Sequence, residues 1–377
     1  MKPRRLLPCL AGPVVTLCLL IPALPAAAER TVCTITVNSS DEKEAFQRHL
    51  PQPGHRFVEL VERGRSDWLA SACRARVQCD VLIVSAHYDG GNTFFPDRLD
   101  LNESLTVTEL ERASCSDSCP SLFSRLKEVY LFGCNTLNSE PQSGASAEIV
   151  RSLVRDGLSA QEAQRQLRSL TAVHGESSRD RMRQIFSGVP VIYGFSSTAP
   201  LGPVAGATLN HHLRAAGVRE VGSGRPSRRL LDAFAPFGLA VSSGAGASGA
   251  QAEARADMCR FADERLSTAT KLAFVHELLH RHVGEARLQL DRIQRLTASL
   301  DEDLRRQPVV AQALEEIARD SVARARWLDY AHGTEPPVQV RLLEVARDVG
   351  WLSAAEHRAE LAAMLRTLQA RRTLGMS

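Results

Sequence analysis

The feature that most constrains the fold is a pair of short, continuous apolar runs at residues 81–84 (VLIV) and 129–132 (VYLF). Both are rich in β-branched or aromatic side chains, and neither alternates with polar residues as a half-exposed strand would. Uninterrupted runs of this length are typical of parallel strands whose sheet is covered by helices on both faces. They predict two neighbouring central strands of an α/β domain.

Each run is followed by a side chain that can take part in catalysis. His87, a potential base, follows the first run (SAHYDGG), and Cys134, a potential nucleophile, follows the second (FGCNTL). In open α/β sheets, ligands bind outside the carboxyl ends of the strands. If the two strands are adjacent, imidazole and thiol face each other across one strand spacing, where a base can take the thiol proton. Alone, a cysteine is commonly a small core residue and a histidine a packing or surface residue. Their joint position favours a catalytic dyad.

The rest of the first two thirds of the chain extends this pattern. Strands are predicted at residues 31–37, 55–61 and 189–195, and helices at residues 41–50, 66–76, 143–156, 159–170 and 207–215. The penultimate of these helices begins with Ser159-x-x-Glu162, a capping box. Alternation of strands and helices predicts a mostly parallel sheet with helices on both faces. A loop at residues 198–203, which carries Pro and Gly, is expected at the same rim as the dyad.

The stretch from His87 to Cys134 resembles the caspase-like (clan CD) cysteine peptidases, and most closely their bacterial CHAT-type branch. The histidine precedes the cysteine by 47 residues, and a caspase-type histidine lies about 50 residues upstream of its cysteine. The resemblance implies a hairpin at residues 94–105 and a helix at residues 107–126 between the two strands. It covers roughly residues 31–215 and implies a caspase-like fold.

The resemblance implies that the protein is an endopeptidase that acts on proteins or peptides. Cys134 would be the nucleophile, His87 the general base, and a thioester acyl-enzyme the intermediate. Backbone N–H groups at Tyr88 and Gly133 would hold the oxyanion. Neither an organic cofactor nor a metal is needed. Tyr88 stands where the family usually has glycine, which favours as the alternative a catalytically inactive relative that serves as a binding or scaffold protein.

Residues 1–28 are typical of a secretory signal peptide. Lys2, Arg4 and Arg5 precede an apolar core, and three alanines at 26–28 form a small-residue cleavage site. The apolar core is shorter than the roughly 20 residues of a membrane span. We therefore expect an exported protein, periplasmic or secreted, with no membrane span after the signal is removed. Removal leaves 43 basic and 43 acidic residues, a balance that gives no reason to expect a nucleic-acid partner.

Seven cysteines remain after removal of the predicted signal: Cys33, Cys73, Cys79, Cys115, Cys119, Cys134 and Cys259. An odd number in an exported protein leaves one thiol unpaired. If Cys134 stays free to attack a substrate, the other six can form three disulfides. Cys115 and Cys119 are close enough in sequence to bridge locally, and the pairing of the rest stays open.

In the last third of the chain, the alternation of predicted strands and helices gives way to predicted helices alone. Residues 241–256 are rich in Gly, Ala and Ser and predict a linker between the α/β domain (29–240) and a helical domain (257–377). Helices are expected along an apolar stripe (Leu272, Val275, Leu279, Val283, Ala286, Leu290 and Ile293), at residues 309–330 and 338–349, and from Ser353, where a second capping box begins. This helical-hairpin domain is a candidate surface for a protein partner.

One motif in the helical domain matches a known zinc-binding pattern. The segment from His276 to His280 (HELLH) matches the H-E-x-x-H pattern, in which two histidines on one helix face bind zinc and Glu277 activates water. Any of several downstream acids could complete the ligand set. Arg281 and His282 follow directly, and the extended G-x-x-H continuation is absent. We therefore prefer an amphipathic helix with histidines on its polar face, and a zinc metallopeptidase is the third hypothesis.

Overall fold

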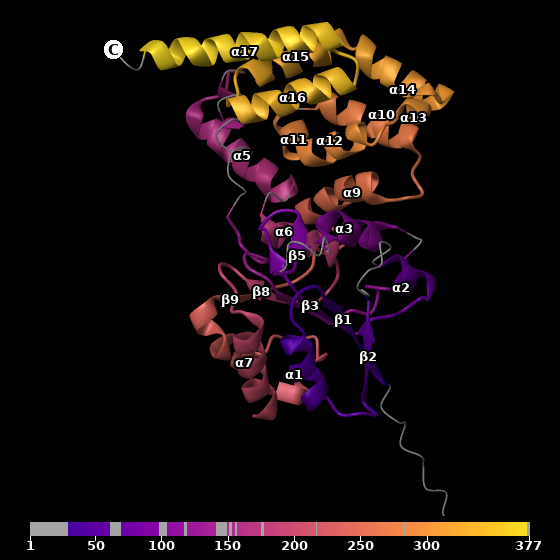
Figure 1. Ribbon diagram of the computed structural model, residues 1–377, viewed down its shortest axis with the longest axis vertical. Helices are drawn as coiled ribbons and strands as arrows, with labels where there is room; N and C mark the ends of the chain where they lie inside the picture. Colours follow the sequence, from indigo (N-terminus) through magenta and orange to yellow (C-terminus); the bar gives the residue numbers. More distant parts are fainter. Residues whose placement is uncertain are drawn as a thin grey trace, which may run out of the picture.

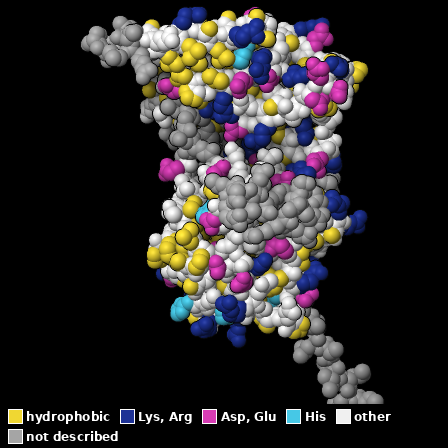
Figure 2. Space-filling model, in the orientation of Figure 1, with side chains coloured by type: hydrophobic (Ala, Val, Ile, Leu, Met, Phe, Trp, Pro, Cys, Tyr) yellow, Lys and Arg dark blue, Asp and Glu magenta, His cyan; other side chains and the backbone are white. Residues whose placement is uncertain are grey.

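The computed structural model describes residues 29–60, 69–97, 104–116, 119–140, 149–150, 153–154, 157–174, 177–215, 217–281 and 283–374. The predicted signal peptide at residues 1–28 lies outside the described residues. A sheet with its covering helices forms the lower half of the molecule, and an all-helical part lies above it (Figure 1). Basic and acidic side chains are interspersed over the face shown in Figure 2.

The centre of the lower half is a six-stranded sheet with the order β2-β1-β3-β7-β8-β9. Its strands are β1 (Arg30–Thr36), β2 (His55–Glu59), β3 (Val81–Ser85), β7 (Glu128–Phe132), β8 (Val191–Phe195) and β9 (Leu239–Ser242). Five strands run parallel and β9 pairs antiparallel with β8. The predicted α/β class and mostly parallel sheet are confirmed. The two apolar runs are adjacent strands, with Ser85 opposite Phe132.

Helices cover both faces of the sheet, as continuous apolar strands require. One face carries α1 (Asp41–His49) and α7 (Gly202–Arg214), and the other α3 (Val107–Cys115), α6 (Ser178–Ile185) and α9 (Ala250–Ala262) (Figure 1). Successive strand side chains point to opposite faces. Val81 and Ile83 therefore belong to the core under α1 and α7, whereas Leu82 and Val84 belong to the core under α3, α6 and α9.

A small antiparallel sheet follows β3. It consists of β4 (His87–Tyr88), β5 (Thr93–Phe95) and β6 (Leu105–Thr106). The helix predicted at residues 107–126 is too long, because α3 ends at Cys115. The segment that follows (SDSCP) is rich in turn-forming residues, and its Cys119 is bonded to Cys73. A turn at residues 121–125 then leads into β7.

The range predicted as a linker, 241–256, contains ordered elements. It includes the end of β9 and the first half of α9. Between them Gly244 N–H donates to the carbonyl of Val189, and Ala245 is fully buried. The described part of the chain before residue 268 also contains α2 (Ala70–Arg74), α5 (Ala160–His174) and α8 (Arg228–Ala233), of which α5 lies against α9 and α11 (Val283–Leu288) (Figure 1). Most of the helix predicted at residues 143–156 lies outside the described residues.

The upper part is entirely helical in its described residues. Its helices are α10 (Thr268–His280), α11 (Val283–Leu288), α12 (Leu290–Ala298), α13 (Glu302–Arg306), α14 (Pro308–Arg319), α15 (Ser321–His332), α16 (Pro336–Asp348) and α17 (Ala354–Leu374). All seven residues of the predicted apolar stripe lie in one buried cluster. The helix predicted at 309–330 is divided at Asp320, which caps α15 by accepting a hydrogen bond from Ala323 N–H. None of the described helices is long and apolar enough to cross a bilayer.

Three disulfides join Cys33 to Cys79, Cys73 to Cys119, and Cys115 to Cys259. Cys134 is the one free cysteine of the described residues, so the predicted division into three pairs and one free thiol is confirmed. The predicted local bridge between Cys115 and Cys119 is wrong. α3 ends at Cys115, and each thiol reaches a different neighbouring helix, α9 and α2 respectively. Disulfides of this number are typical of proteins in oxidising compartments.

Candidate active site

The turn after β7 presents Cys134 at the carboxyl edge of the sheet. Asn135 has a positive φ of 57°, in the left-handed region that asparagine tolerates better than most residues. Strand β8 passes so close to this turn that a Cβ on Gly194 would lie 2.6 Å from Thr136 Oγ1. Thr136 Oγ1 also accepts a hydrogen bond from Phe195 N–H at 3.0 Å. Turn and strand therefore fix each other's position, and glycine is required at the contact.

The thiol of Cys134 is half-buried and has an amide donor. The backbone N–H of Ala199 donates to Sγ at 3.3 Å. Such a donor stabilises negative charge on the sulfur. The loop that begins after β8 thus lies against the thiol, at the rim where the sequence places it. The backbone N–H of Cys134 itself has no hydrogen-bond partner within the described part of the chain. It can therefore donate a hydrogen bond to an oxygen atom of a bound substrate.

His87 lies just beyond the end of β3, as the first residue of β4, and its ring is held by the side chain of Asp97. Its Nε2 is hydrogen-bonded to the carboxylate of Asp97 and lies 3.3 Å from Asn38 Nδ2. Asn38 Oδ1 in turn accepts from the backbone N–H of Asp97 at 2.9 Å. The hydrogen bond from His87 lowers the pKa of Asp97. With Nε2 engaged by the carboxylate, Nδ1 is the ring nitrogen left for proton exchange with a thiol.

His87 and Cys134 line one cavity of about 250 Å³. Typical small-molecule pockets measure roughly 300–1,000 Å³, so this cavity suits a single side chain or a short peptide segment. The structure therefore brings the two residues of the predicted dyad to the same cavity, just beyond the carboxyl ends of the adjacent parallel strands β3 and β7.

The two residues predicted to hold the oxyanion have different surroundings. Tyr88 is buried, stacks on Phe94 with ring centroids 4.6 Å apart, and donates its hydroxyl to the carbonyl of Gly91 at 2.9 Å. Burial raises the pKa of this phenol. A Cβ on Gly133 would lie 3.0 Å from both Tyr88 Cβ and the carbonyl of Ala86. The tyrosine side chain therefore packs in the core behind the turn, and Gly133 lines the cavity.

Sequence reasoning missed an acidic residue in this cavity. Glu42, near the start of α1, is only 3% exposed, and burial raises the pKa of its carboxyl to about 7. Ser39 Oγ donates to its Oε2 at 3.4 Å, a long bond. The buried hydroxyl of Ser85 lines the same cavity and makes no hydrogen bond of good geometry within the described residues. The signal available in the sequence was the polar run at 38–42, which follows β1 at the same sheet edge.

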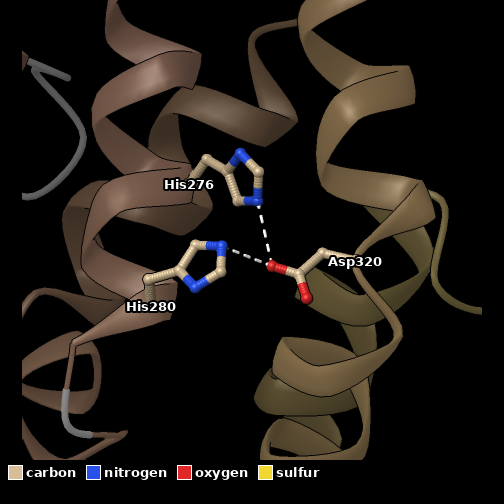
Figure 3. A group of neighbouring side chains, drawn as sticks. All are labelled: His276, His280 and Asp320. Atoms are coloured by element: carbon tan, nitrogen blue, oxygen red, sulfur yellow. Dashed lines mark hydrogen bonds and ion pairs between the residues drawn. The ribbon is translucent and has the colours of Figure 1, made fainter.

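The histidines of the HELLH segment come together with a residue that the sequence did not single out. His276 Nε2 and His280 Nε2 lie 3.1 Å and 2.6 Å from the same oxygen, Asp320 Oδ2 (Figure 3). Glu277 is instead half-exposed and forms ion pairs with Arg260 and Arg281. These residues belong to the helical part and do not line the cavity that holds the dyad.

Comparison with protein-family models, with curated proteins and with solved structures gave no match for this chain. The resemblance to caspase-like peptidases therefore depends on the residues and spacing quoted above. It enters below as a proposal.

Proposed function

We propose that this protein is an exported cysteine endopeptidase with a caspase-like α/β domain, related to the CHAT-type branch. The observation that carries the proposal is the shared cavity. His87 and the one free cysteine of the described residues line it together, at the carboxyl ends of two adjacent parallel strands. The three disulfides and the predicted signal peptide support a site of action in the periplasm or outside the cell.

The proposed reaction begins when Nδ1 of His87 takes the proton of the Cys134 thiol. The thiolate attacks the scissile carbonyl, a C–S bond forms, and the oxyanion accepts hydrogen bonds from the backbone N–H of Cys134 and its neighbours. Collapse breaks the C–N bond while the imidazolium protonates the leaving amine. Water, deprotonated by His87, then hydrolyses the thioester and restores the thiol. Asp97 accepts a hydrogen bond from Nε2–H throughout and stabilises the imidazolium.

A second candidate is a catalytically inactive relative that binds peptides or serves as a scaffold. The bulky Tyr88 beside Gly133, where the family usually has glycine, is the observation that favours it. The helical part, residues 257–377, would then provide a second surface for a protein partner. The zinc-peptidase hypothesis receives less support, because both oxygens of Glu277 are engaged by arginines.

The test is cleavage of a fluorogenic peptide library by the wild type, Cys134→Ala, His87→Ala and the double variant. Residues that act as one unit lose about as much activity singly as together, whereas independent contributions multiply. His211→Ala is the matched control, because His211 is exposed on α7 and does not line the cavity. Full activity of Cys134→Ala would refute the mechanism. A wild type inactive towards every peptide, even after limited proteolysis, would favour the binding protein.

A further inference from the structure

Three side chains that the proposed peptidase reaction does not use converge in the helical part. His276 and His280 come from α10, and Asp320 precedes the first residue of α15 (Figure 3). Their potential ligand atoms all lie within 4.8 Å of one another. The two imidazole rings are 4.7 Å apart between centroids and both direct Nε2 to one carboxylate oxygen.

The local structure explains this convergence. Residues four apart lie on the same face of a helix, so His276 and His280 project together from α10. Asp320 is fixed in place because it caps α15, with its Oδ1 accepting from Ala323 N–H at 2.9 Å. Capping leaves Oδ2 for the imidazoles.

The geometry suits a metal ion of the size and preference of zinc. Two imidazole nitrogens and one carboxylate oxygen are common Zn²⁺ ligands, and bonds of 2.0–2.2 Å place tetrahedral ligands about 3.3 Å apart. The present separations to Asp320 Oδ2 are 3.1 Å from His276 and 2.6 Å from His280, so these ligand atoms must move apart by about 0.2 and 0.7 Å. The His280 side chain is 55% exposed, which leaves access for the ion and for a water ligand.

We propose that His276, His280 and Asp320 form a Zn²⁺ site that links α10 to the start of α15, with water in the fourth position. This site differs from an H-E-x-x-H peptidase centre in the role of Glu277. Arg281 and Arg260 each engage one carboxylate oxygen of Glu277, at 2.6 and 2.7 Å. Glu277 is therefore a poor base for a metal-bound water. The metal holds two helices together and takes no part in peptide hydrolysis.

The alternative is that the three side chains form only interhelical hydrogen bonds. Asp320→Asn separates a metal site from plain hydrogen bonding, because asparagine is an equally good helix N-cap and its Nδ2 can still donate to an imidazole nitrogen. It removes only the anionic ligand. Loss of an outer-shell partner already costs about 10–100-fold in metal affinity, so we expect Asp320→Asn, His276→Gln and His280→Gln each to weaken Zn²⁺ binding by at least about 100-fold.

The experiment uses the whole mature chain in a Cys134→Ala background, which removes the other thiol–imidazole pair able to bind zinc. Chelator-treated protein is titrated with ZnCl₂ by calorimetry and with CoCl₂ by visible absorption, and thermal unfolding is followed with and without the ion. We expect one equivalent bound, tetrahedral Co²⁺ absorption bands and a higher Tm with metal. His332→Gln is the control, because the His332 ring pairs with the carboxylate of Glu360 at 2.9 Å and does not belong to the His276–His280–Asp320 cluster. This variant should bind zinc like its parent.

Absence of zinc and cobalt binding by this protein overturns the proposal. Equal binding by the parent and by Asp320→Asn or His276→Gln overturns it as well, because the ion would then lie elsewhere. Folding of each variant is verified by far-UV circular dichroism without metal, so that loss of binding reports on the ligand set. Neither outcome bears on the peptidase proposal, which depends on His87 and Cys134 alone.

Discussion

Replacing Glu42 by glutamine should change the pH dependence of stability by an amount that follows from its burial. Removal from water raises the pKa of this carboxyl from 4.5 to about 7, and the negative charge of Asp41 adds to the shift, while the Glu42 backbone and Ser39 hydroxyl partly offset it. A shift of about 2.5 pH units corresponds to about 3 kcal/mol of folding free energy. Glutamine keeps the size of the side chain and does not titrate.

The sign of the effect follows from linkage. Because the folded pKa is raised, the folded state holds the proton more tightly than the unfolded state does. The stability that this carboxyl contributes is fully present below the unfolded pKa of 4.5, falls as pH rises through the folded pKa of about 7, and is lost above it. The wild type should therefore lose about 3 kcal/mol relative to Glu42→Gln between pH 4.5 and pH 8.

Urea unfolding of both proteins at several pH values between 4.5 and 8 measures this difference, and contributions from all other groups cancel in the comparison. Glu44→Gln is a matched control on the same helix. Its carboxylate is exposed and bonded to Ser40 Oγ, so the substitution should shift stability by no more than about 0.5 kcal/mol. A difference between wild type and Glu42→Gln that is constant from pH 4.5 to pH 8 would show that this carboxyl is not buried as described.

Three further predictions concern activity and stability. Asp97→Asn should lower kcat/KM by at most about fivefold, because Asp97 is exposed and such pairs contribute about 1 kcal/mol or less. Glu111→Gln should destabilise the protein by about 3–5 kcal/mol in urea unfolding, since it leaves the buried Arg292, 2.5 Å away, without its counter-ion. Above pH 7, where Glu42 is ionised, a peptide library should be cleaved preferentially at Arg or Lys, and Glu42→Gln should abolish that preference.

The sequence predicted the sheet well because its central strands are unambiguous. The continuous apolar runs at 81–84 and 129–132 correspond to β3 and β7 within one residue at each end. A strand that is buried on both faces is apolar at nearly every position, so its limits are easily recognised in the sequence. β9 was missed, because a short antiparallel edge strand that is only half-buried has no such signature.

The side chains around the dyad could not be predicted in the same way. Asp97 and Glu42 come from segments on either side of β3, and only the folded chain shows that both reach the edge where His87 lies. Asp320 is a similar case. It lies in the middle of a stretch predicted as one continuous helix, and only the folded chain shows the break between α14 and α15 that leaves its Oδ2 for the two histidines.

The claim central to this account is that Cys134 is a reactive thiol activated by His87. The most direct measurement is alkylation of the native, non-reduced mature protein with iodoacetamide near pH 7, followed by mass spectrometry of its peptides. We expect the peptide that carries Cys134 to be labelled and the other six cysteines to be recovered as three disulfide-linked pairs, with much slower labelling in His87→Ala. Recovery of Cys134 in a disulfide, or equal labelling rates in the wild type and His87→Ala, would contradict the account.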